Sequence, residues 1–144
     1  MQNYTDLDDF DPKDIEQALQ KIRAEAEAER RLDQELDALP ETAYEDVRRF
    51  FRIIGRRLPR PDIMPLDNGD IGLEWREAQK IFTLSFGGDG HIVFAGIFSE
   101  ENRARGILTF SMGHLTAIVG MINSLYADEP NFNKSIDNLN VCIV

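Results

Sequence analysis

The chain of 144 residues has one cysteine, two histidines and no long hydrophobic run. The lone Cys142 excludes an intramolecular disulfide framework and leaves no cysteine cluster for zinc. His91 and His114 lie far apart in the sequence, whereas a helical metal site needs two histidines four positions apart. We therefore expect no bound metal and no cofactor.

Targeting signals are also scarce. No apolar stretch approaches the roughly 20 residues that span a bilayer. Residues 1–14 have neither the basic start nor the apolar run of a signal peptide. We expect a cytoplasmic protein that does not enter a membrane.

The hydrophobic content is sufficient for a core, because 42% of the residues are apolar and nine are phenylalanine. A compact chain of this length buries roughly 70% of its unfolded surface. One compact domain is therefore expected. Within it the sequence suggests four parts: a flexible acidic arm (1–10), a helical hairpin (11–58), a sheet with a helix (59–126) and a tail (127–144).

Charge is distributed unevenly within a formal net charge of −10. Residues 1–46 carry fifteen acidic and five basic side chains, and residues 61–144 carry eleven acidic and five basic ones. Between them, residues 47–60 carry six arginines and no acid. The order along the chain is acidic, basic, acidic.

The first predicted helix begins at Asp11 and Pro12, which suit an N-cap and a first helical position. It is expected to continue to Leu39, because the residue before a proline is pushed out of the helical region. Its alanine-rich, charged middle, residues 23–31, offers little apolar surface. Part of this helix is therefore expected to project, or to pack against a second copy.

The second predicted helix covers about residues 43–58. Its N-terminus matches a capping box, with Thr42 as N-cap and Glu45 reaching back. Apolar residues recur at helical spacing along one side. They are Val47, Phe50, Phe51, Ile54 and Leu58.

Four alternating segments then predict strands, at residues 71–75, 80–86, 91–98 and 106–111. Asn68-Gly69 and the "GGDG" at 87–90 are turn signals between them. A further amphipathic helix is expected at 111–126 to cover one sheet face. The predicted fold class is α+β: two N-terminal helices, a four-stranded antiparallel meander and a C-terminal helix packed on the sheet. The final "VCIV" suits an edge strand or a tucked end.

The segments "DNGDIGLEW", "IFTLSF" and "GGDGHIVFAG", with the closing helix, resemble a broad set of uncharacterised small bacterial and phage proteins. The resemblance covers residues 59–126. It implies the same helix-and-meander fold and a genomic setting among mobile elements and small defence or toxin-linked genes. It implies no activity.

Five arginines lie along one side of the second predicted helix: Arg48, Arg49, Arg52, Arg56 and Arg57. In one interpretation the protein's own carboxylates neutralise them, since Glu45 lies three positions before Arg48. In the other they bind an acidic patch of a protein partner, or about five phosphates of a nucleic acid. The net charge of −10 makes nucleic acid the less favoured partner, because carboxylates repel phosphates.

The acidic arm allows the opposite kind of contact. Spaced carboxylates can imitate phosphates and occupy a nucleic-acid-binding groove on another protein. The alternative is a solvated tail that improves solubility. The candidate partner-binding residues are Asp6, Asp8, Asp9 and Asp11, with Tyr4 and Phe10 as apolar anchors.

No residue is predicted to be catalytic. Glu74 and Trp75 alternate on a strand, so Trp75 is expected in the core and Glu74 on the other face. Ser111 lacks the glycine-flanked elbow of hydrolases and suits a local cap with His114. A small enzyme would require a pocket in which His114, Glu74 or Asp89 converge.

The favoured function is a non-enzymatic acidic interaction protein that binds a protein partner. We expect an inhibitor, or an antitoxin-like or immunity-type regulator with an anti-defence role, from a phage or other mobile element. The partner would be a nucleic-acid-processing or toxin protein. A nucleic-acid-binding module that uses the arginine-rich helix is the alternative, and a small enzyme is the third possibility. A homodimer is also expected, through the first helix or the "VCIV" edge.

Overall fold

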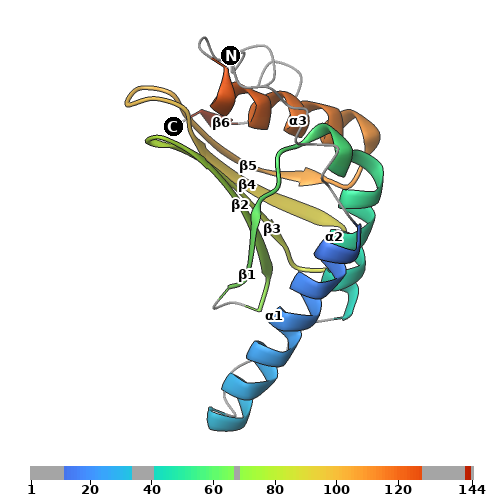
Figure 1. The fold of residues 1–144 in the computed structure, drawn as a ribbon. Coiled ribbons are helices and arrows are strands. Elements are labelled where there is room, and N and C mark those ends of the chain that lie inside the picture. The colour runs from blue at the N-terminus through green and yellow to red at the C-terminus, as the bar shows by residue number, and fades with distance from the viewer. Residues whose placement is uncertain (1–11, 34–40, 67–68, 128–141, 144) are drawn as a thin grey trace.

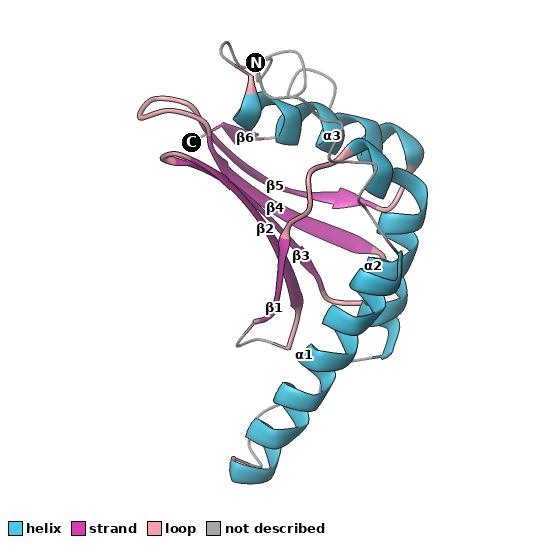
Figure 2. Ribbon diagram, viewed as in Figure 1, coloured by secondary structure: helices cyan, strands magenta, loops and turns pink. Residues whose placement is uncertain are grey.

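The computed structural model describes residues 12–33, 41–66, 69–127 and 142–143. The fold is α+β, as predicted, with its helices on one face of a single antiparallel sheet (Figure 1, Figure 2). The helices are α1 (Pro12–Leu32), α2 (Glu41–Ile54), the short 3-10 helix η2 (Gly55–Arg57) and α3 (Met112–Tyr126).

The sheet has six strands that follow one another in sequence order, each antiparallel to its neighbours. They are β1 (Asp62–Pro65), β2 (Ile71–Glu77), β3 (Lys80–Phe86), β4 (His91–Ile97), β5 (Arg103–Thr109) and β6 (Cys142–Ile143). The predicted four-stranded meander corresponds to β2–β5. The edge strand β6 lies in "VCIV" and is one of the two outcomes expected for it, whereas β1 was not predicted. Strand β1 is short and contains a proline, so it has no clear alternating pattern.

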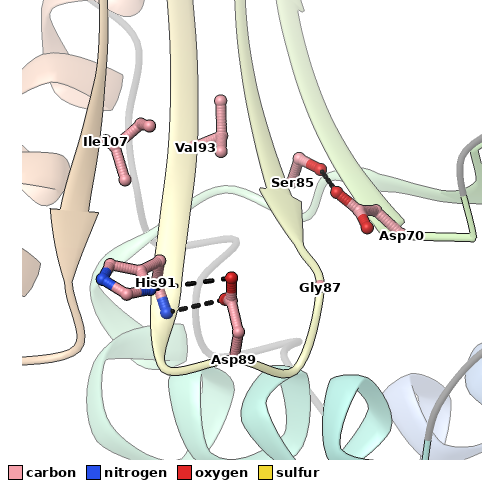
Figure 3. A pocket seen from close by; sticks show the side chains of 7 residues that line it. All are labelled: Asp70, Ser85, Gly87, Asp89, His91, Val93 and Ile107. Atoms are coloured by element: carbon pink, nitrogen blue, oxygen red, sulfur yellow. Dashed lines mark hydrogen bonds and ion pairs between the residues drawn. The ribbon is translucent and has the colours of Figure 1, made fainter.

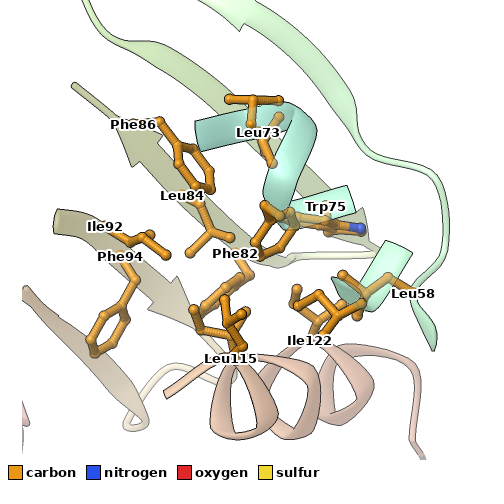
Figure 4. Packing of buried hydrophobic residues seen from close by; sticks show 14 of the residues in the cluster. Leu58, Leu73, Trp75, Phe82, Leu84, Phe86, Ile92, Phe94, Leu115 and Ile122 are labelled. Atoms are coloured by element: carbon orange, nitrogen blue, oxygen red, sulfur yellow. The ribbon is translucent and has the colours of Figure 1, made fainter. Parts of the chain in front are cut away.

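One face of the sheet is buried against the helices, and we call it the covered face. Alternate side chains of the central strands, among them Trp75, Phe82 and Phe94, pack there against α2 and α3 (Figure 4). Trp75 is 1% exposed, as predicted, and its Nε1 donates a hydrogen bond to the Pro59 carbonyl at 2.7 Å. The apolar stripe predicted on the second helix is fully buried in this core.

Helix α1 ends at Leu32, earlier than the predicted Leu39, and residues 34–40 lie outside the described residues. Ile15, Leu19 and Ile22 are buried, but no described residue of the helix beyond Ile22 is. Leu32 is 91% exposed. The C-terminal half of α1 therefore projects past the sheet, as its alanine-rich sequence predicted (Figure 1).

The capping box predicted at Thr42 is wrong. Helix α2 begins at Glu41, which places Thr42 inside its first turn. The Glu45 carboxylate accepts a hydrogen bond from Arg48 at 2.7 Å. Thr42 instead lies against the β3–β4 turn, where a Cβ on Gly88 would collide with its Oγ1. Thr42 therefore makes a tertiary contact with the β3–β4 turn instead of capping the helix.

Candidate protein-binding surfaces

Arg48 is neutralised within the molecule. Its Nε and Nη2 donate to the two carboxylate oxygens of Glu16 on α1, both at 2.8 Å, and its Nη1 donates to Glu45. The hydrogen bond from Arg48 lowers the pKa of Glu16, and the same bond raises the pKa of Arg48. A two-pronged contact of this kind fixes direction as well as charge. Arg48 therefore joins α1 to α2.

Two further arginines contribute to this contact between the N-terminal elements. Arg23 of α1 donates to Glu41 at 2.7 Å and lies over the Tyr44 ring, 4.3 Å from its centroid. Arg60 donates to Asp14 at 3.1 Å. The acidic first helix and the basic segment that follows thus neutralise each other in part, which is one of the two interpretations of the arginines.

The other end of the basic segment is different. Arg52, Arg56 and Arg57 are exposed and make no hydrogen bond or ion pair with another described residue. We call these three residues the arginine cluster. Arg49 lies beside them with its guanidinium 4.3 Å from the Phe110 ring centroid. Positive charge is favourable at the C-terminus of a helix.

The acidic arm lies outside the described residues. Tyr4, Asp6, Asp8, Asp9, Phe10 and Asp11 are therefore still a prediction as partner-binding residues.

A second surface is the sheet face opposite the helices, which we call the open face. Two large apolar side chains are exposed on it, Val93 (43%) and Ile107 (67%). They are direct neighbours in the β4–β5 register. The open face consists of Gly72, Glu74 and Arg76 (β2), Ile81, Thr83 and Ser85 (β3), His91, Val93, Ala95 and Ile97 (β4), and Arg103, Arg105, Ile107 and Thr109 (β5).

The open face has opposite charges at its two sides. One row across the sheet runs from Glu74 through Thr83 and Ala95 to Arg105. On the β2 side, Glu74 accepts a hydrogen bond from Arg76 at 2.7 Å, and exposed Asp62 of β1 stands opposite it in the register. On the β5 side, Arg105 makes no ion pair within the described part of the chain.

A shallow depression of about 240 Å³ lies at one end of the open face (Figure 3). Ser85 Oγ donates to Asp70 Oδ2 at 2.7 Å. The backbone N–H of His91 donates to Asp89 Oδ1 at 3.0 Å, and its ring Nδ1 lies 3.6 Å from Asp89 Oδ2. Val93 and Ile107 form the apolar side.

This depression does not contain the convergence that an enzyme would require. Ser85 Oγ donates its hydrogen bond to Asp70, and His91 contacts Asp89 rather than Ser85. Glu74 is bound to Arg76 on β2. His114 is at the start of α3, where its backbone N–H donates to Ser111 as predicted and its ring contacts Thr109. Among the residues that the structure describes, no three His, Cys, Asp or Glu side chains are grouped to hold a metal ion.

Sequence reasoning found the arginines but missed the open face as a surface. The signal was present in "HIVFAGI" (91–97), where apolar residues occupy both sets of alternating positions. Such a strand presents apolar side chains on both faces of the sheet, including the face that the helices do not cover. That Glu74 and Arg105 lie in the same row of the sheet could be known only from the strand register, which no local sequence pattern contains.

Comparison with known proteins adds no relative: no family model, no curated protein and no solved structure matches this chain. No helix in the described ranges is long and apolar enough to cross a membrane.

Proposed function

We propose that this protein is a non-enzymatic acidic regulator that acts by binding a protein partner, as an inhibitor or as an antitoxin-like or immunity-type protein. The observation that carries the proposal is the arginine cluster: three exposed cations with no ion pair among the described residues, in a segment whose Arg48 and Arg60 are bound to Glu16 and Asp14. Guanidinium groups bind carboxylates in a directed, two-pronged manner. The partner surface is therefore expected to be acidic.

The predicted acidic arm gives the regulator a second contact of opposite sign, against a basic groove of the same partner. Charges of both signs at one interface speed association and reject partners with the wrong pattern. The resemblance of residues 59–126 to phage and bacterial proteins supports a setting in a mobile element, in the cytoplasm, with a toxin or a nucleic-acid-processing protein as target.

The alternative is a nucleic-acid-binding module. The arginine cluster favours it, because three unpaired guanidinium groups can neutralise about three phosphates and give a log–log salt slope near −3. The net charge of −10 disfavours it, since the rest of the molecule repels a polyanion.

The test compares three full-length proteins in pull-downs from nuclease-treated bacterial lysate: the wild type, the cluster variant R52Q/R56Q/R57Q and the control K21Q/R30Q/R31Q. The control removes the same charge from the exposed part of α1. We expect a defined protein that the wild type and the control retain and the cluster variant loses, and that forms a complex when purified. A chain lacking residues 1–10 tests the arm in the same way.

Fluorescence anisotropy with labelled DNA and RNA oligonucleotides decides the alternative. Binding by the wild type that falls steeply with salt, and is lost only in the cluster variant, would favour the nucleic-acid module and overturn the protein-partner proposal. Equal retention of the protein by all three chains would exclude the cluster as the binding surface.

A further inference from the structure

The open face carries apolar side chains that take no part in the core on the covered face. Val93 and Ile107 form an exposed pair, with Ala95 exposed beside them and Ile81 and Ile97 partly exposed on the next row. Exposed apolar side chains grouped on one surface mark interaction sites more often than isolated ones do.

The charges on this face are self-complementary: the acidic side of one copy can face the basic side of a second copy. Glu74 on β2 and Arg105 on β5 lie in one row, three strand spacings or about 14 Å apart, with Asp62 of β1 and Cys142 of β6 beyond them. That separation is too large for a pair within one molecule. A two-fold axis parallel to the strands, placed between β3 and β4, brings β2 of one copy over β5 of the other. It places each Arg105 over the other copy's Glu74, because an isologous contact makes every pair twice.

The apolar row follows the same relation. Gly72, Ser85, Val93 and Ile107 form one row across the sheet. The two-fold axis places Ile107 of one copy over Gly72 of the other, where the Leu66 side chain fills the space that a Cβ on the glycine would need. The two Val93 side chains come to lie beside the axis. Apolar groups thus meet along this row, and opposite charges meet in the row that contains Glu74 and Arg105.

We propose that the open face binds the open face of a second copy, with β2 over β5, Arg105 against the partner's Glu74, and the partner's Asp62 one strand further out. Opposite Arg103, the same axis places Arg76, which is already neutralised by Glu74. Asp62, Glu74 and Arg76 together carry one negative charge, so the two arginines of β5 face a net acidic side. The contact uses no residue of the arginine cluster and is independent of the proposed function.

The small area of the open face limits the affinity that we expect for the dimer. Four seven-residue strands form a plane of about 19 by 23 Å, smaller than the roughly 800 Å² per partner of a standard interface. We therefore expect a reversible dimer with a dissociation constant of about 1–100 µM.

Sedimentation equilibrium of the full chain over about 1–500 µM measures this constant. R105E is expected to weaken the dimer at least about tenfold, because it places like charges opposite each other at both ends. The triple variant E74R/R76E/R105E reverses the charges on both sides and keeps the Glu–Arg pair of β2, so it is expected to restore the dimer to within about threefold of the wild type. I107D should weaken it independently by about tenfold, because a carboxylate replaces the apolar contact.

R30E is the matched control, with the same charge change on the exposed part of α1 and no expected effect. Thermal unfolding followed by circular dichroism establishes that each variant is folded. A wild type that stays monomeric throughout the concentration range would overturn the proposal. So would a dimer that R105E and I107D leave intact, since self-association would then use another surface such as α1 or the β6 edge. Failure of the triple variant to recover would overturn the two-fold pairing.

Discussion

The covered face and the open face of the same strands differ in burial and in the kind of side chain that they carry. On β4, Phe94 is completely buried while its neighbour Val93 is 43% exposed, although both side chains are apolar. The covered face is filled by aromatic and aliphatic groups from three helices. The open face carries an apolar row through Val93 and Ile107 and a charged row with Glu74 and Arg105. One face holds the fold together, and we propose that the other binds a second copy.

The largest expected loss of stability comes from a substitution on the covered face. Phe82 is fully buried and its ring lies about 6 Å from those of Trp75, Phe94 and Phe98. Phe82→Ala is expected to lower the free energy of unfolding by about 3–5 kcal/mol, because it leaves a cavity. Urea denaturation measures this. Thr83→Ala, on the open face of the same strand, should stay within about 0.5 kcal/mol of the wild type. Equal losses would mean that the two faces do not differ in this way.

The second prediction concerns how the covered face meets α2. Gly88 has φ +81°, and a Cβ there would collide with Thr42 and lie 2.6 Å from the Ala43 nitrogen. Gly88→Ala is expected to cost about 2–4 kcal/mol, from the positive φ and from the collision together. Gly90→Ala separates the two causes, since Gly90 has φ +82° and nothing within 4 Å. Its expected cost is about 1–2 kcal/mol. Similar unfolding midpoints for both variants would contradict the tight contact.

The third prediction breaks the charge link between α1 and α2. Arg48→Met is expected to reduce the free energy of unfolding by about 1–2 kcal/mol at pH 7, a charge-assisted value discounted for partial exposure. Arg52→Met is the control, because Arg52 has no ion pair with another described residue, and it should change little.

The effect of Arg48→Met depends on pH through Glu16. The folded state lowers the pKa of Glu16 from its ordinary value of 4.5, so its contribution is fully present above pH 4.5. This contribution is lost as the pH falls through the lower folded pKa. Unfolding curves for the wild type and Arg48→Met are therefore expected to converge in strong acid. A difference that stays constant down to pH 2 would contradict this origin.

The smallest effect is expected on the open face. Ile107 is 67% exposed, whereas Leu108, the next residue, is 2% exposed. Ile107→Thr should change the free energy of unfolding by no more than about 0.5 kcal/mol when measured in dilute protein. Leu108→Thr should cost several times more, because it buries a hydroxyl in the core. A large loss for Ile107→Thr would mean that this face is needed for folding.

Local patterns in the sequence predicted much of this fold. The stripe of Val47, Phe50 and Ile54 predicted a buried helix face, and all three residues are buried. Alternation predicted β2–β5 and the burial of Trp75. These predictions hold because helix and strand periods are properties of neighbouring residues. The Thr42 cap failed because a turn from β3–β4 occupies that position, and turn and helix are more than forty residues apart in the sequence.

The site was less predictable than the fold. The acid–base–acid order along the chain indicated that arginines would be neutralised internally. It did not indicate that Arg48 would be paired with Glu16 while Arg52 would remain unpaired. Both arginines lie on α2, four positions apart. The difference comes from where α1 begins, because Glu16, near the first residue of α1, reaches Arg48.

The sequence by itself determined most of the helices and strands, the burial of the covered face and the net charge of −10, because these depend on composition and short-range period. Only the tertiary structure decided which arginines pair with carboxylates among the described residues, and that Glu74 and Arg105 lie three strands apart in one row. Register and helix docking are set by contacts between residues far apart in the chain, which no local pattern encodes.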